Sequence, residues 1–298
     1  MADALLRELQ QALPELEVRR EEPLKNYTSF AIGGPAELLL LPSSAEELAS
    51  LCALLRTLGV KPLMLGNGSN VLAPDEGLRG AVIVTRRASD MKRRGESIVA
   101  DCGASLTRIA AFAAEEGLAG LEFAYGIPGT LGGALIMNAG AYGGEMKDVT
   151  VRAEYLDGEL RRRSAVGAEL DFGYRRSRFG PEDVVLRAEL RLLPGQREEI
   201  KARCRELTEK RRASQPLELP SAGSAFKRPA SGYAAAMIDQ AGLKGYTVGG
   251  AQVSGKHAGF VVNRGNATAA DVKKLLEDVQ RAVYDRTGIL LEPEIKML

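Results

Sequence analysis

Glycine is unevenly distributed along this chain of 298 residues. Sixteen of its 33 glycines lie between Gly59 and Gly144, and no fixed period relates them, so the pattern is not that of a repeat protein. Glycine adopts backbone conformations that other residues avoid, and it lets the backbone approach a ligand or another backbone closely. The pattern therefore predicts short strands and helices joined by tight loops, with a ligand held by those loops.

Charge and composition exclude several classes of function. The chain has 40 Lys and Arg against 39 Asp and Glu, a net charge of +1, whereas a protein that coats nucleic acid needs a basic surplus. No apolar run approaches the ~18 residues of a membrane-spanning helix. The acids that begin at Asp3 argue against a secretory leader. We expect a cytoplasmic monomer with no nucleic-acid or membrane partner.

Histidine and cysteine are too sparse for most metal chemistry. Cys52, Cys102 and Cys204 are isolated, so we expect neither a disulfide framework nor a zinc cluster. We expect all three to be buried small apolar residues or idle thiols. The single histidine, His257, cannot build a multi-histidine metal site, and no G-x-S-x-G motif is present. Chemistry without metal or histidine often depends on an organic cofactor.

Hydrophobic periodicity and turn residues predict a mixture of strands and helices as far as Leu193. Ser44 and Glu47 form the pattern of a capping box, and Asp157-Gly158 is typical of a hairpin turn. The predicted helices are Ala2–Leu13, 45–58 and Leu106–Glu116. The predicted strands are Ala36–Leu41, Leu63–Leu65, Ala81–Val84, Ile98–Ala100, Val149–Leu156, Glu159–Ser164 and Val184–Leu193.

Pro194-Gly195 marks a predicted boundary, after which the pattern indicates a smaller α+β unit. Thr268–Arg286 is the clearest helix, because five apolar side chains recur on one face at helical spacing. The other predicted elements are helices at Glu198–Arg212 and Ala234–Gln240, and strands at Thr247–Ser254, Gly259–Asn263 and Ile289–Leu298.

The first glycine loop is Leu65-Gly66-Asn67-Gly68-Ser69-Asn70-Val71, which follows a predicted strand. It does not fit the dinucleotide pattern G-x-G-x-x-G, because Val71 replaces the third glycine and irregular chain rather than a helix is predicted to follow. Such a loop can still surround phosphates with backbone N–H groups. A tight turn with no ligand explains it equally well.

The second glycine loop is Gly126-Ile127-Pro128-Gly129-Thr130-Leu131-Gly132-Gly133-Ala134. No lysine follows its glycines, so it is not a P-loop. A glycine turn that opens a helix of small residues presents free N–H groups and the positive end of the helix dipole, which suits a pyrophosphate. Close packing of helices through small residues is the alternative.

Eight short motifs follow one another along nearly the whole chain, from about residue 24 to 296. They are Asn26–Pro35, Leu65–Val71, Gly126–Gly144, Tyr174–Ser177, Ser221–Pro229, Leu243–Gly245, Lys256–Asn263 and Leu291–Ile295. In this order they resemble the MurB family of UDP-N-acetylenolpyruvoylglucosamine reductases. Any one motif is weak, but eight in family order are highly specific.

The resemblance implies an α+β fold of the vanillyl-alcohol-oxidase (PCMH) type. Residues 1–84 with the tail 290–298 and residues 85–195 would form two subdomains that hold FAD non-covalently. Residues 196–289 would form an α+β substrate-binding domain. Only 48 positions separate Arg175 from Ser224, too few for the tyrosine-bearing insertion of the longer subgroup, so the chain resembles the shorter subgroup.

The resemblance also implies a reaction and its residues. NADPH would reduce FAD, and the reduced flavin would pass hydride to UDP-N-acetylglucosamine enolpyruvate, giving UDP-N-acetylmuramate for peptidoglycan synthesis. Arg175 would grip the substrate carboxylate, Ser224 would donate the proton, and Glu294 would be the second acid. Without the resemblance, each is equally a solvated charge or a turn residue.

The remaining site residues are carried over from the same motifs. FAD would contact Tyr27, Thr28, Ile32, Leu65, Gly66, Asn67, Gly68, Ser69, Asn70, Gly126, Ile127, Pro128, Gly129, Thr130, Gly133, Ala134, Asn138 and Gly140. The UDP-sugar would contact Tyr174, Lys227, Arg228, Lys244 and His257.

Two other functions stay open on this fold. An FAD-dependent oxidase or dehydrogenase of another alcohol or sugar would need a base where this chain offers Ser224. A nucleotide-sugar binding protein without turnover would need neither Ser224 nor Glu294.

Overall fold

The computed structural model describes residues 2–298, which divide into two compact units. The first unit comprises the described residues up to Arg20 together with Leu38–Asn67 and Gly80–Lys210, and the second comprises Glu21–Glu37, Gly68–Arg79 and Arg211–Leu298. Each unit has its own hydrophobic core. The three predicted domains divide the chain differently from these two units, and that division stays a prediction.

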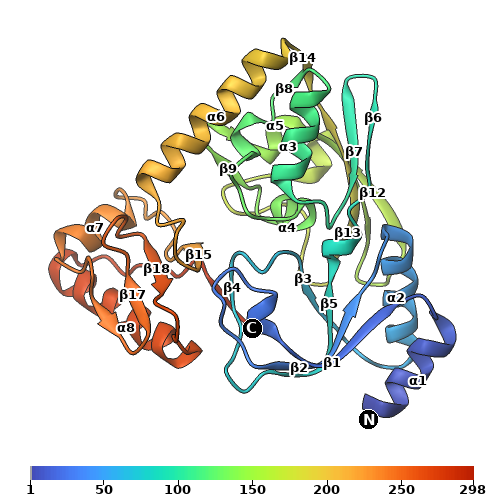
Figure 1. The fold of residues 1–298 in the computed structure, drawn as a ribbon, viewed down its shortest axis with the longest axis horizontal. Coiled ribbons are helices and arrows are strands. Elements are labelled where there is room, and N and C mark those ends of the chain that lie inside the picture. The colour runs from blue at the N-terminus through green and yellow to red at the C-terminus, as the bar shows by residue number, and fades with distance from the viewer. Residues whose placement is uncertain (1) are drawn as a thin grey trace. The chain divides into compact units, whose positions relative to one another are not determined.

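A five-stranded antiparallel sheet is the base of the first unit (Figure 1). Helices α2 (Ala45–Thr57), α3 (Leu106–Glu115) and α4 (Leu131–Ile136) pack against it. Ala100, Ala153 and Ala188 are buried in the core of the unit, where their small side chains let the helices approach. The strand order is β12 (Arg162–Val166), β11 (Thr150–Leu156), β13 (Val184–Arg191), β7 (Ser97–Asp101) and β6 (Met91–Arg94).

The first unit also contains most of a four-stranded sheet and several short elements. The sheet order is β1 (Glu17–Pro23), β2 (Pro35–Leu41), β5 (Leu78–Val84) and β3 (Leu63–Leu65), with β3 parallel to β5. The other elements are α1 (Ala2–Ala12), β8 (Leu118–Ala119), β9 (Gly140–Ala141), β10 (Gly144–Glu145), α5 (Met146–Val149), β14 (Leu193–Pro194), α6 (Arg197–Ser214) and the 3-10 turns Thr85–Arg87, Glu122–Ala124 and Gly167–Leu170.

The second unit is a small α+β structure. Helix α8 (Ala269–Thr287) packs on a four-stranded antiparallel sheet and on α7 (Ala234–Gln240). The sheet order is β15 (Ser221–Ser224), β18 (Phe260–Asn263), β17 (Ala251–Val253) and β16 (Thr247–Val248). Separately, β4 (Val71–Leu72) pairs in parallel with β19 (Lys296–Met297), and Leu24–Asn26 is a 3-10 turn.

Most of the predicted elements are confirmed. Helix α8 begins after Thr268, whose side chain accepts a hydrogen bond from the Asp271 N–H. The five predicted apolar residues of α8, namely Val272, Leu275, Leu276, Val279 and Val283, are all buried. At α2, Ser44 caps the helix as predicted, but Glu47 accepts from the N–H of Ser43 rather than that of Ser44.

Three predicted strands are wrong in extent. After Asp157 the chain forms a five-residue loop, because the Asp157 carboxylate accepts from the N–H groups of Glu159 and Arg161, and β12 begins only at Arg162. The predicted strand Thr247–Ser254 is two strands, since Gly249-Gly250 forms a turn between them. The predicted final strand is reduced to β19 and a bridge at Pro293.

Candidate active site

The two glycine loops, predicted separately, lie together where they belong to the first unit. A Cβ atom at Gly66 would lie 2.2 Å from the Thr130 Oγ1 atom, so only glycine fits against the second loop. The Asn67 side chain donates a 2.8 Å hydrogen bond to the Pro128 carbonyl oxygen. Thr130 is buried, while Asn67 and Gly129 are half-buried. The loops thus form one glycine-lined surface from segments sixty residues apart.

Unpaired backbone donors mark this surface. The N–H groups of Asn67, Gly129 and Thr130 have no hydrogen-bond acceptor among residues 2–298. A backbone N–H needs a partner, so these groups suit water or an anionic ligand. The prediction of free N–H groups at the start of α4 is partly wrong. The N–H groups of Leu131 and Gly132 donate to the carbonyl oxygens of Ala104 and Cys102, each at 2.8 Å, because this segment pairs with the chain before α3.

The rest of the first glycine loop belongs to the second unit and packs on the Tyr27 segment. Gly68 has a φ of +58°, and a Cβ atom there would lie 2.2 Å from the Tyr27 carbonyl oxygen. The Ser29 N–H donates to the Gly68 carbonyl oxygen at 3.1 Å. As far as the described residues show, the N–H groups of Ser69 and Asn70 have no protein acceptor. Glycines without room for a Cβ and unpaired N–H groups together fit the diphosphate of a dinucleotide.

Thr28 and Ile32 belong to the same segment. Both are buried, and the Thr28 hydroxyl donates to the Ile32 carbonyl oxygen at 2.9 Å. Tyr27 is buried as well. The segment is therefore well packed beside the glycine loop.

Ser224 and Glu294 lie close together in the second unit. Strand β15 pairs Ser221 with Val262 but Ser224 with Phe260, so it carries one extra residue, and Gly223 at this bulge has a φ of +76°. A bulge re-aims the side chain that follows it, and bulges are common beside active sites. The Glu294 N–H donates to the Ala225 carbonyl oxygen at 2.9 Å, which places Glu294 beside this bulge.

Asn70 connects the glycine loop to the same place. Its side chain donates to the Glu294 carbonyl oxygen at 3.2 Å, and Gly223 lies near the Ser69 carbonyl oxygen. Ser224 and Glu294 are both half-buried. The second unit thus gathers a predicted cofactor loop, the predicted proton donor and the predicted second acid.

Arg175 belongs to the first unit, in a tight turn. The N–H of Gly173 donates to the Arg176 carbonyl oxygen at 2.9 Å, and the N–H of Arg176 donates back at 3.3 Å. Between them Arg175 has a φ of +54°, a strained conformation for a residue other than glycine. Its guanidinium carbon lies 5.6 Å from the centre of the Tyr174 ring, which is exposed.

Asn138 and Gly140 have local structural explanations. A Cβ atom at Gly140 would lie 2.7 Å from the Glu145 Cγ atom, so the hairpin of β9 and β10 requires glycine there. Tyr142 and Gly143 form its turn, both with positive φ, as a type I′ turn needs. Asn138 is buried and hydrogen-bonded to Glu145. Glu145 was not among the predicted site residues, because no local pattern signalled this contact.

The predicted substrate cations are held by acids or rings of the second unit. Lys227 pairs with Glu292, Lys244 pairs with Asp239 at 2.7 Å, and the Arg228 guanidinium lies 4.1 Å from the centre of the Tyr233 ring. These partners hold the cations in place at a half-buried or exposed surface. Exposed pairs of this kind exchange partners at little cost, so they leave the cations available to phosphate.

His257 has a structural role of its own. Its Nδ1 atom accepts a hydrogen bond from the Gly259 N–H at 3.1 Å, and its ring meets Phe260 edge to face at 5.0 Å. Burial lowers the pKa of His257, and the charge of Lys244 lowers it further. The neutral ring therefore carries its proton on Nε2, which is a donor for a ligand.

Neither the thiols nor a metal cluster offers a competing site. Cys52, Cys102 and Cys204 are free and buried, as predicted, and burial raises the pKa of Cys102 to about 12. A thiol with so high a pKa is a poor nucleophile. Among residues 2–298, no group of three or more His, Cys, Asp or Glu side chains is arranged to hold a metal ion.

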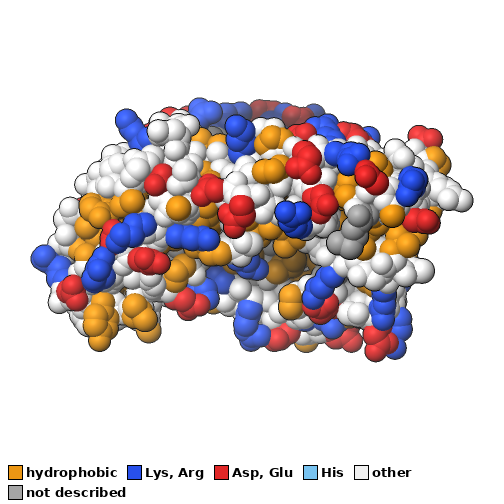
Figure 2. Space-filling model, turned by 90° about the horizontal axis from the view of Figure 1, so that it is seen from below, with side chains coloured by type: hydrophobic (Ala, Val, Ile, Leu, Met, Phe, Trp, Pro, Cys, Tyr) orange, Lys and Arg blue, Asp and Glu red, His pale blue; other side chains and the backbone are white. Residues whose placement is uncertain are grey.

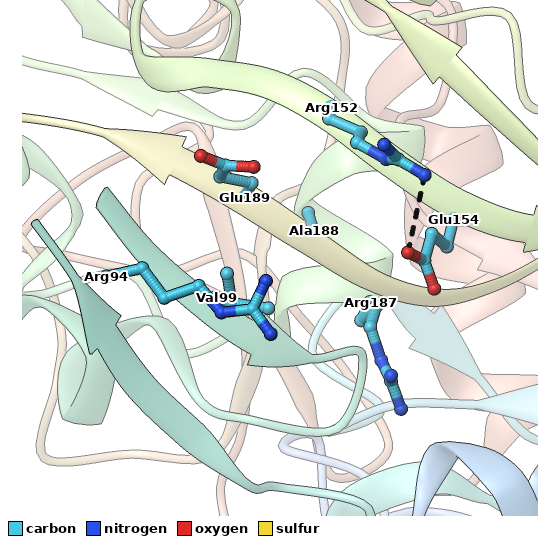
Figure 3. A pocket seen from close by; sticks show the side chains of 7 residues that line it. All are labelled: Arg94, Val99, Arg152, Glu154, Arg187, Ala188 and Glu189. Carbon is cyan, nitrogen blue, oxygen red and sulfur yellow. Dashed lines mark ion pairs between the residues drawn. The ribbon is translucent and has the colours of Figure 1, made fainter.

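A depression of about 280 Å³ on the five-stranded sheet is lined by seven residues, none of which is a predicted site residue (Figure 3). Its arginines are largely neutralised. Arg187 pairs with Asp101 at 3.2 Å and with Glu46 at 3.1 Å, and Arg152 pairs with Glu154 at 3.6 Å. This depression is therefore not the site that the sequence motifs indicate.

Two protein-family models match the chain. The model of the UDP-N-acetylenolpyruvoylglucosamine reductase C-terminal domain matches residues 215–298, and the model of an FAD binding domain matches residues 36–161. The second match contains both glycine loops and confirms FAD as the predicted cofactor.

Full-length relatives agree with these models. The UDP-N-acetylenolpyruvoylglucosamine reductase of Caldanaerobacter subterraneus subsp. tengcongensis is 47% identical over 100% of this chain and 99% of its own length. That of Pediococcus pentosaceus is 44% identical over 96% of each chain. A solved structure of the reductase (MurB) from Thermus caldophilus matches with a TM-score of 0.80 and 37% identity, covering 95% of this chain and 98% of that one. The predicted α+β FAD-binding fold is confirmed.

Proposed function

Because this chain belongs to the UDP-N-acetylenolpyruvoylglucosamine reductase family, we propose that it reduces UDP-N-acetylglucosamine enolpyruvate to UDP-N-acetylmuramate. NADPH is the reductant, FAD is the cofactor, and the product serves peptidoglycan synthesis. The observation that carries this proposal is the 47% identity to a named reductase over the whole of both chains.

The glycine loops would hold FAD. Within the first unit, Asn67, Gly129 and Thr130 would bind its diphosphate through their N–H groups. Ser69 and Asn70 of the second unit are predicted FAD contacts that have N–H groups of the same kind. FAD, when bound, supplies the hydride chemistry between NADPH and the substrate. The chain's own contribution is to bind the substrate, stabilise charge and supply a proton.

Three side chains would share that contribution. Hydride arriving at the vinyl CH2 carbon leaves an electron pair on the neighbouring carbon, stabilised through the substrate carboxylate. Arg175 would bind that carboxylate through two N–H bonds. Ser224 would donate a proton to the carbon, and Glu294 would support the charge and return a proton to the serine.

The charge distribution does not favour nucleic acid as a partner. Figure 2 shows Lys, Arg, Asp and Glu side chains interspersed over the face in view, consistent with the net charge of +1. Lys227, Arg228, Lys244 and His257 would bind the uridine diphosphate. No helix within residues 2–298 has the length and apolar character to cross a membrane. We further propose that the protein is a cytoplasmic monomer.

Product formation tests the proposal. The purified protein with FAD is given NADPH and UDP-N-acetylglucosamine enolpyruvate, and UDP-N-acetylmuramate is measured by mass spectrometry. UDP-N-acetylglucosamine, which lacks the enolpyruvyl group, is the control. We expect one product molecule per NADPH oxidised and none with the control. Oxidation of a sugar alcohol, or binding without product, would favour the oxidase or the binding protein instead.

A further inference from the structure

The carboxamide of Asn138 uses its hydrogen-bonding capacity within the first unit. Its Nδ2 group donates to the Glu145 carboxylate at 2.9 Å and to the Gly173 carbonyl oxygen at 3.1 Å. Its Oδ1 atom accepts from the Lys147 N–H at 2.9 Å. The reversed amide would turn an oxygen toward both Glu145 and Gly173, so this orientation is the one the partners allow.

Gly173 opens the turn that presents Arg175. Two hydrogen bonds between Gly173 and Arg176 close the turn, and Arg175 inside it has a φ of +54°. A residue in this region persists only where its surroundings hold it there. Asn138 supplies such support. Its side chain, which is only 3% exposed, donates a hydrogen bond to the Gly173 carbonyl oxygen.

Glu145 extends this support. It lies opposite Gly140 in the hairpin of β9 and β10. Its carboxylate accepts a hydrogen bond from the Asn138 side chain and forms an ion pair with the Lys147 Nζ atom at 2.8 Å. The charge of Arg175 is near enough to help lower the pKa of Glu145, after the larger contributions of Lys147 and Asn138. Glu145 therefore faces the turn as an ionised carboxylate.

We propose that Asn138 and Glu145 are positioning residues for Arg175, holding its turn in the strained conformation that the substrate carboxylate requires. This rests on the proposed role of Arg175 in the reaction. This role is an alternative to the predicted contact of Asn138 with FAD, because its carboxamide is already hydrogen-bonded to Glu145, Gly173 and Lys147.

Separate measurement of the two half-reactions tests the inference. In Asn138→Ala we expect oxidation of the reduced flavin by the enolpyruvyl sugar to slow at least tenfold, while reduction by NADPH, FAD content and the visible spectrum stay within twofold of the parent. Thr150→Val is the matched control, because it removes a 2.8 Å hydrogen bond from the buried Thr150 hydroxyl to Met146 nearby. It also loses a buried hydrogen bond, but it should leave both half-reactions unchanged.

The Arg175→Ala background distinguishes positioning from an independent effect. If Asn138 acts through Arg175, adding Asn138→Ala to Arg175→Ala slows flavin oxidation no further. Equal slowing in both backgrounds, loss of FAD, or an unchanged oxidation rate in Asn138→Ala would overturn the inference. If Asn138→Ala does not fold, Glu145→Gln replaces it, with the same expected pattern at smaller size. Arg175→Ala with an unchanged rate would overturn the proposed role of Arg175 and the inference with it.

Discussion

Ser224 owes its position to the glycine before it. Gly223, at a φ of +76°, adds one residue to β15, and Glu294 lies beside the resulting bulge. The hydroxyl of a serine is a weak acid, so it can donate only to a strong base held in the right place. A carbon that has just gained an electron pair is such a base.

Ser224→Ala should therefore separate the two halves of the reaction. We expect NADPH to reduce the flavin at the parent rate, while oxidation by the enolpyruvyl sugar falls about 10²–10⁴-fold, the usual contribution of a general acid. Ser221→Ala, on the same strand, is the control and should change neither rate. Unchanged turnover in Ser224→Ala would remove the serine from the mechanism.

Substitution of Gly68 tests whether the first glycine loop binds FAD. Alanine there meets both a positive φ and a carbonyl oxygen at 2.2 Å, so the backbone must move. Gly242 has a φ of +76° with no heavy atom within 4 Å of an added Cβ, so Gly242→Ala measures the positive φ alone, about 1–2 kcal/mol. We expect Gly68→Ala to lose FAD as well as stability, and Gly242→Ala to keep its FAD. Equal FAD content in both variants would contradict the assignment of the loop.

Helix α8 shows how local signals decide an element. Thr268 and Asp271 cap it reciprocally: the Asp271 carboxylate accepts from the Thr268 N–H at 3.0 Å and from the Gly250 N–H at 3.2 Å. These backbone donors lower the pKa of Asp271. The cap joins the helix to the turn between β16 and β17.

The lowered pKa of Asp271 makes this contribution depend on pH. Its stabilisation is fully present above the ordinary carboxyl pKa of 3.8 and is lost as the pH falls through the lower pKa of the folded state. We expect Asp271→Asn to be less stable than the parent in urea at pH 7, and the difference to narrow at pH 3 and below. A difference that stays constant across this range would show that the charge is not what matters.

Elements with local signals could be predicted from the sequence, whereas those set by distant contacts could not. Helix α7 has its predicted bounds, and α8 begins one residue after its predicted start. The predicted hairpin after Leu156 is confirmed, but its turn is longer than the dipeptide Asp157-Gly158 indicates, because the Asp157 side chain shapes the loop. In the site, motifs predicted the glycine loops, but the link from Asn138 to Gly173 spans 35 positions and exists only in the fold.

On the scale of the whole molecule, the first glycine loop passes from one compact unit to the other. Leu65–Asn67 belong to the first unit and Gly68–Asn70 to the second. A ligand that binds only the folded chain stabilises it by mass action, by about 2.7 kcal/mol at one hundred times its Kd.

Removal of FAD should therefore lower stability. We expect the apoprotein to unfold at a lower temperature than the holoprotein. Adding FAD back should return the unfolding temperature to that of the holoprotein. Riboflavin, which lacks the diphosphate, should restore much less. Equal recovery with riboflavin would mean that the glycine loops do not bind phosphate.

One flavin serves both half-reactions of the proposed reaction, and anaerobic visible absorbance follows that flavin through each of them. NADPH is added first, and UDP-N-acetylglucosamine enolpyruvate second. We predict that the yellow band bleaches with NADPH and returns with the enolpyruvyl sugar. A band that bleaches but returns only when oxygen is admitted would contradict the assigned substrate, and a protein with no yellow band after FAD is added would contradict the flavin itself.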